Sequence, residues 1–161
     1  MTNDRQTIYL HGLMSSSQGF KATLLRRVLP DILTPDFEGT LDERMVRLRS
    51  ILGARLGWTI VGSSCGGLMG ALFTCRHPDQ VSRLVLLAPA LVWPDFAQTP
   101  PAPVSAPTVA YHGRADTVVP LEAVRPLAER VFTNLVFHAV DDDHGLHATV
   151  QSIDWPRLVQ L

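Results

Sequence analysis

Short apolar runs alternate along this chain with longer stretches in which apolar residues recur at helical spacing. The runs predict strands at residues 7–10, 31–35, 58–61, 84–87, 108–111 and 135–140. The longer stretches predict helices at residues 20–29, 41–56, 66–76 and 121–131, with a last helix from residue 146 toward the C-terminus that breaks near Pro156. Strands that alternate with helices predict a parallel sheet covered on both faces. The expected fold class is therefore α/β, with a doubly wound, mostly parallel sheet of six strands.

The length of 161 residues suits one hydrophobic core, so we expect a single domain over residues 1–161. The one shift in composition lies at residues 88–107, which are rich in proline. This segment is expected to form an irregular loop over the carboxyl ends of the strands, where ligands bind in sheets of this kind.

Acidic and basic residues are mixed along the chain, and the formal net charge is −1 at pH 7. Without a basic stripe to neutralise phosphates, nucleic acid is not an expected partner. No apolar run approaches the roughly 18 residues of a membrane-spanning helix, so a membrane is not expected either. The polar residues 1–6 lead straight into a strand without the pattern of a secretory signal, which predicts a cytoplasmic protein. The oligomeric state is left open, and a homo-oligomer is compatible with the sequence.

No cofactor or metal is expected, because the CxxC and HExxH patterns are absent. The two cysteines, Cys65 and Cys75, fall on one predicted helix, roughly 15 Å apart along its axis. That separation is too large for a disulfide. Cys75 is interpreted as a small buried apolar residue.

The segment GSSCGG at residues 62–67 follows one predicted strand and opens the next predicted helix. Its pattern, G-x-S-x-G in a strand–turn–helix context, is that of a nucleophile elbow. Only small residues fit two positions before and after the serine of so tight a turn, and Gly62 and Gly66 meet this demand. Ser64 is therefore the candidate nucleophile. A glycine-rich turn without chemistry and a register centred on Cys65 are the alternatives.

A nucleophilic hydroxyl needs a base, and the base needs an orienting acid. His144 follows the last predicted strand in a loop that can reach the sheet edge, and it is the preferred base; His147 is the second choice. Asp116 follows the fifth predicted strand and is the preferred acid. Asp95 is the alternative acid, and a helix cap is the structural interpretation of Asp116. The order of serine, aspartate and histidine along the chain suits a nucleophile elbow.

Two backbone N–H groups are expected to bind a developing oxyanion. One belongs to Cys65, the residue after the nucleophile, and the other to Leu13 in the loop after the first strand. Met14 and Trp93 are predicted to line the substrate site, together with Leu91 and Phe96. His112 precedes a glycine and is expected to shape its loop.

These motifs resemble the α/β-hydrolase superfamily. The resemblance is carried by residues 60–67 with residues 10–12 upstream, by an acid loop at residues 111–120 and by a histidine loop at residues 143–144. The opening Leu-His-Gly-(apolar)-x-Ser-Ser pattern at residues 10–16 is similar to that of small bacterial capless esterases and thioesterases. The resemblance implies six strands instead of eight, because the first hairpin is absent, and no insertion long enough for a lid follows the fourth strand.

The resulting hypothesis is a serine hydrolase that cleaves short-chain carboxylic esters or thioesters through an acyl-enzyme. Ser64 would attack, His144 would carry the proton and Asp116 would orient the imidazole. A non-catalytic binding protein on the same fold is one alternative. An acyltransferase or perhydrolase that uses the same three residues is another.

Overall fold

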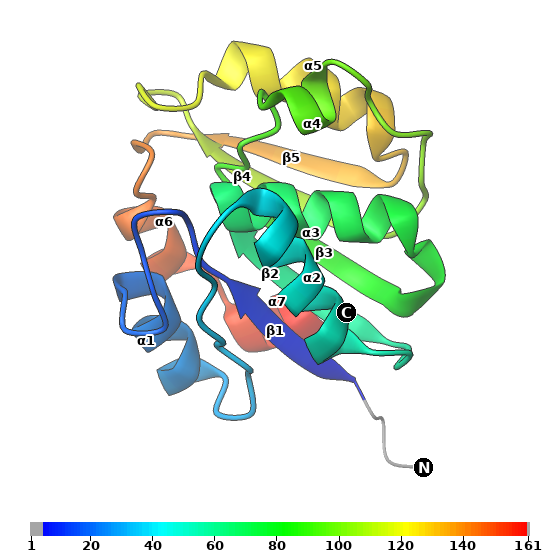
Figure 1. Cartoon of the computed structure of the whole chain (residues 1–161). Helices are drawn as coiled ribbons and strands as arrows, with labels where there is room; N and C mark the ends of the chain where they lie inside the picture. The colour runs from blue at the N-terminus through cyan, green and yellow to red at the C-terminus, as the bar shows by residue number, and fades with distance from the viewer. Residues whose placement is uncertain (1–4, 161) are drawn as a thin grey trace.

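The computed structural model describes residues 5–160, and it contains a five-stranded sheet in which every neighbouring pair is parallel. The order in the sheet follows the chain: β1 (Gln6–Leu10), β2 (Trp58–Ser63), β3 (Val81–Leu87), β4 (Thr108–Gly113) and β5 (Leu135–Val140) (Figure 1). The expected α/β class is confirmed. Most of the polar segment at residues 1–6, from which the absence of a secretory signal was predicted, lies outside the described residues, as does Leu161.

The strand predicted at residues 31–35 is wrong, so the sheet has five strands instead of six. Leu33 forms only an isolated parallel bridge with Ile8. The N–H of Tyr9 donates to the Leu33 carbonyl at 2.8 Å, and the N–H of Leu33 donates to the Thr7 carbonyl at 2.9 Å. The next bond of this ladder would need an N–H at Pro35, which proline lacks, and pairing stops there.

Helices join the strands and flank them. Their bounds are α1 (Phe20–Val28), α2 (Leu41–Leu52), α3 (Cys65–Arg76), the short 3₁₀ helix η1 (Pro78–Gln80), α4 (Pro94–Ala97), α5 (Leu121–Val131), α6 (His147–Ser152) and α7 (Trp155–Gln160). α2 ends before the predicted residue 56 because Gly53, at φ 56°, caps it. The predicted last helix is two helices, and Pro156 lies in the first turn of α7, where proline is tolerated.

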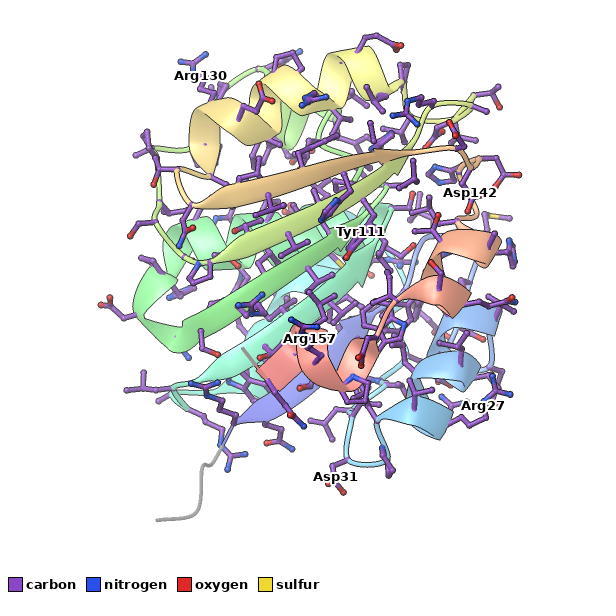
Figure 2. All side chains as sticks on the ribbon, turned by 180° about the vertical axis from the view of Figure 1, so that it is seen from behind. Arg27, Asp31, Tyr111, Arg130, Asp142 and Arg157 are labelled. Carbon is purple, nitrogen blue, oxygen red and sulfur yellow. The ribbon has the colours of Figure 1, made fainter. Side chains whose placement is uncertain are left out.

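The side chains of successive strand residues pack alternately into two buried clusters, one on each face of the sheet. Ile60 packs on the face covered by α2, α3, α4 and α5, whereas Val61 packs on the face covered by α1, α6 and α7. The first group of helices lies in front of the sheet in Figure 1, and the second group lies in front when the molecule is turned around in Figure 2. This arrangement confirms helices on both faces.

The segment between β3 and β4 contains α4, of four residues, and a bridge between Val104 and Phe132. It packs onto the body of the protein and builds no cap over the strand ends. Within residues 5–160, no helix is long and apolar enough to cross a bilayer.

Candidate active site

Ser64 lies at the sharp turn between β2 and α3. Its backbone, at φ 55° and ψ −115°, occupies a region that L-residues rarely adopt. Two neighbouring segments hold this conformation: the Ser64 N–H donates to the Leu87 carbonyl at 3.0 Å, and the Ser64 carbonyl accepts from the Ala90 N–H at 3.0 Å. The strained turn is therefore anchored to β3 and to the loop that follows it, and it presents Ser64 to a cleft.

The turn requires glycine on both sides of Ser64. A Cβ atom on Gly62 would overlap the Gly66 carbonyl, and a Cβ atom on Gly66 would overlap the Leu10 carbonyl. The two glycines thus allow α3 to start directly against β1 and β2. The same packing directs Cys65 into the core, where it is 1% exposed.

Three side chains that the sequence singled out lie within hydrogen-bond distance in series. The Nε2 atom of His144 is 3.1 Å from Ser64 Oγ, and its Nδ1 atom is 2.7 Å from Asp116 Oδ2. The second oxygen of Asp116, Oδ1, accepts from the N–H groups of Val118 at 2.9 Å and Val119 at 2.7 Å. A carboxylate can only accept, so Nδ1 carries the proton and Nε2 is free to accept one from the serine hydroxyl.

His112 also faces Asp116, a contact that the sequence reasoning missed. His112 lies at the end of β4 and is fully buried, with Nε2 2.8 Å from the Val119 carbonyl and 3.3 Å from Asp116 Oδ2. Because a carbonyl only accepts, Nε2 must carry the proton, and the buried Nδ1 has no partner in the described residues. The available signal was a histidine four positions before the candidate acid at a strand end.

The loop that carries His144 is held by its own carboxylates. Asp142 accepts from the Asp143 N–H at 2.8 Å and from the N–H and hydroxyl of Thr149 at 3.0 and 2.8 Å. Burial alone would raise the pKa of Asp142, but the hydrogen bonds from Thr149 and Asp143 outweigh it and hold that pKa below its usual value. Figure 2 shows Asp142 in the loop that leaves β5. These bonds fix the path of the chain around His144.

The residues considered as alternatives are His147 for the base, Asp95 for the acid and Cys65 for the nucleophile. His147 lines the same cleft from α6, with its ring 4.4 Å from that of Phe20, but forms no hydrogen bond with Ser64 in the described structure. Asp95 is exposed on α4 and does not line the cleft. Burial raises the pKa of the Cys65 thiol, which disfavours a thiolate there. Cys75 is partly buried against the core, and both cysteines are free.

The loop after β1 lies against Ser64. A Cβ atom on Gly12 would be 3.4 Å from Ser64 Cβ, and Leu13 lines the cleft beside it. The buried His11 accepts the Phe37 N–H at Nε2 (2.9 Å), so its Nδ1 carries the proton and donates to the Gly12 carbonyl at 2.7 Å.

The orientation of the Gly12 carbonyl determines that of the next N–H. The C=O and N–H of a trans peptide point in opposite directions, so the Leu13 N–H is turned away from His11. This N–H has no hydrogen-bond partner among residues 5–160. Cys65 is the first residue of α3, and the first N–H groups of a helix have no acceptor within it. Both predicted donors thus lie beside Ser64 with open bonding capacity.

The cleft has a volume of about 640 Å³. Met14 and Trp93, predicted to line it, do so; Met14 is fully exposed at its mouth. Leu91 and Phe96 do not line it, because both are fully buried, and Phe96 packs on Phe132 with ring centroids 6.4 Å apart. Within residues 5–160, no group of three or more histidine, cysteine, aspartate or glutamate side chains is arranged to hold a metal ion.

The comparisons with known proteins agree on the fold. The family model of the alpha/beta hydrolase fold matches residues 15–104, more than half of the chain, including the turn at Ser64. No curated protein sequence matches the chain.

Several solved structures share this architecture, and three of them are described here. The alpha/beta hydrolase domain-containing protein 10 from mouse has a TM-score of 0.77 at 19% identity. The aligned region covers 92% of this chain and 86% of the mouse chain. Est1E from Butyrivibrio proteoclasticus with ferulic acid bound has a TM-score of 0.74 at 17% identity. The aligned region covers 97% of this chain and 89% of the Est1E chain. Monoacylglycerol lipase from Paleococcus ferrophilus has a TM-score of 0.75 at 16% identity. The aligned region covers 96% of this chain and 93% of the lipase chain. The chain belongs to the α/β-hydrolase family.

Proposed function

We propose that this protein is a serine hydrolase that cleaves short-chain carboxylic esters or thioesters through an acyl-enzyme. The observation that carries the proposal is the position of the His144 imidazole, with one nitrogen 3.1 Å from Ser64 Oγ and the other 2.7 Å from Asp116 Oδ2. This is the arrangement that a hydroxyl needs in order to lose its proton as it attacks a carbonyl.

In the proposed reaction, Ser64 Oγ attacks the acyl carbonyl while His144 Nε2 takes its proton. Asp116 stabilises the resulting imidazolium, and the N–H groups of Leu13 and Cys65 donate to the oxyanion. His144 then protonates the leaving alcohol or thiol, which departs and leaves the acyl group on Ser64. A water molecule, deprotonated by His144, releases the acid and regenerates the serine.

The cleft supports a small acyl substrate. Apolar side chains from the loops after β3 and β4 line it, among them Val92, Trp93 and Val118. The segment between β3 and β4 contributes α4 alone as a helix, so no cap encloses a long chain. Two of the similar structures are described as Est1E with ferulic acid bound and a monoacylglycerol lipase, which supports ester substrates.

A fluorophosphonate probe tests the proposal, because it reacts with activated serines and leaves an inert binding protein unlabelled. We expect one labelled site at Ser64, lost in Ser64→Ala and kept in Cys65→Ser. Unlabelled wild-type protein, or a label that moves with Cys65, would overturn the assignment of the nucleophile.

A further inference from the structure

The sequence contains a single lysine, Lys21, and it lies in the first turn of α1. Every other strongly basic side chain of the chain is an arginine. Lys21 is half-buried and lines the same cleft as Ser64 and His144. The proposed reaction gives this ammonium no role, although it is a permanent feature of the cleft wall.

Lys21 has no partner that neutralises it directly. Among residues 5–160, no carboxylate forms an ion pair with it. Asp142 and Asp143 attract it from a distance, but Asp142 is bound to Thr149 and Asp143 to the Gly145 N–H at 3.0 Å. The ammonium therefore retains donors that can serve a ligand.

Burial makes an unpaired ammonium at this place costly. It lowers the pKa of Lys21, an effect that the attraction of Asp142 and Asp143 only partly offsets. A desolvated cation of this kind is stabilised when an anion reaches it. A negatively charged group of a ligand would supply that anion.

The surroundings of Lys21 are suited to a carboxylate. The hydroxyl-bearing side chains of Tyr9 and Ser63, both buried, line the same cleft. Burial raises the pKa of the Tyr9 phenol, an effect that its hydrogen bond with Ser63 only partly offsets, so the phenol stays protonated. The loops after β3 and β4, in contrast, contribute apolar residues such as Ala90, Val92 and Val118. Leu13, Met14 and Phe20 add further apolar surface, so the cleft combines one ammonium and the hydroxyls of Tyr9 and Ser63 with apolar walls.

We propose that the substrate is an ester with a free carboxylate in its acyl part, a monoester of a short dicarboxylic acid, and that Lys21 binds this carboxylate. The inference rests on the proposed hydrolase activity and narrows its substrate class. The acyl group passes from the alcohol to Ser64 and then to water, so the products are the alcohol and the dicarboxylate, and the carboxylate on Lys21 is unchanged.

A pair of matched esters tests the proposal. The p-nitrophenyl monoester of glutaric acid and p-nitrophenyl valerate have acyl chains of equal length and differ in the terminal carboxylate. The measured quantity is the ratio of kcat/KM for the anionic ester to that for the neutral ester. We expect Lys21→Met to lower this ratio roughly tenfold, the range of a charge-assisted hydrogen bond, and Lys21→Arg to lower it less.

Arg27→Met is the matched control, because it removes the same charge from the same helix. Arg27 is exposed on the outer side of α1 (Figure 2) and lines a separate hollow with Leu24 and Val150. We expect it to leave the ratio unchanged. A Lys21→Met protein with the wild-type ratio, or an equal fall in Arg27→Met, would overturn the role of Lys21 while leaving the hydrolase assignment intact.

A binding measurement separates this inference from the hydrolase assignment. Reductive methylation with ¹³C-formaldehyde labels Lys21 as the one side-chain amine, with the N-terminal amine as an internal reference. In the Ser64→Ala protein, monomethyl glutarate should shift the Lys21 signal, whereas methyl valerate should not. Equal responses to both esters, or no response to either, would exclude carboxylate binding at Lys21 whatever the hydrolysis assays show.

Discussion

The Nε2 atom of His112 lies 3.3 Å from Oδ2 of Asp116, and both side chains are fully buried. The same oxygen lies 2.7 Å from Nδ1 of His144, while the other carboxylate oxygen accepts two backbone N–H groups. Oδ1 of Asp116 thus has two donors and Oδ2 has one, with the His112 ring packed against it, so the carboxylate cannot rotate without losing some of these contacts. This places the acid of the proposed mechanism in one orientation toward His144.

Replacing His112 tests whether this orientation matters. His112→Leu removes the donor to the Val119 carbonyl and leaves that acceptor buried and unpartnered, which costs about 1–3 kcal/mol of unfolding free energy. We also expect kcat on p-nitrophenyl acetate to fall roughly tenfold, because Asp116 loses the ring that packs against the oxygen facing His144. His112→Gln, whose amide N–H can replace Nε2–H, should recover part of the activity. Wild-type kcat in folded His112→Leu would show that His112 only fills space.

Glycine at position 66 is required by packing and not by backbone conformation, since its φ is not in the left-handed region. In Gly66→Ala the new methyl group would meet the Leu10 carbonyl, so α3 must move away from β1. We expect a loss of roughly 1–3 kcal/mol or more, measured by chemical denaturation. In the control Gly12→Ala, the methyl group meets Ser64 Cβ at an ordinary 3.4 Å. Equal stability of both variants would contradict the close approach of α3 to β1.

The hydrogen bonds at Asp142 predict a dependence of stability on acid pH. The pKa of Asp142 in the folded protein lies below the ordinary value of 3.8, so the ionised carboxylate stabilises the fold above that pH. This stabilisation is lost as the pH falls through the lower folded-state value. Asp142→Asn should therefore have a lower Tm than wild type at pH 7, and the difference should shrink below pH 3.8. A difference that stays constant from pH 7 to strongly acid solution would argue against the ionic role.

The features of this protein that could be predicted from the sequence are those that depend on residues close together in the chain. Short apolar runs identified the five strands, and small residues around Ser64 identified the turn between β2 and α3. Position after a strand narrowed the candidates to a few residues, among them Asp116 and His144, because parallel strands end at one edge of a sheet. The run at residues 31–35 had a strand-like composition, but its ladder depends on a single N–H that Pro35 lacks.

What sequence could not predict depends on how loops and helices dock. Leu91 and Phe96 occupy a proline-rich loop whose path decides which side chains face inward, and both turned out to be core residues. The contact of His112 with Asp116 depends on the turn between them bringing Nε2 back to the carboxylate. The position of Lys21 in the cleft depends on how α1 packs beside α6, a contact between segments far apart in the chain.

The turnover of p-nitrophenyl acetate by Ser64→Ala decides whether Ser64 performs chemistry. We expect kcat to fall roughly 10⁴-fold or more in a variant with wild-type circular dichroism, because the three residues act as a unit. His144→Ala should show a fall of similar order. Turnover by folded Ser64→Ala near that of wild type would show that Ser64 is not the nucleophile.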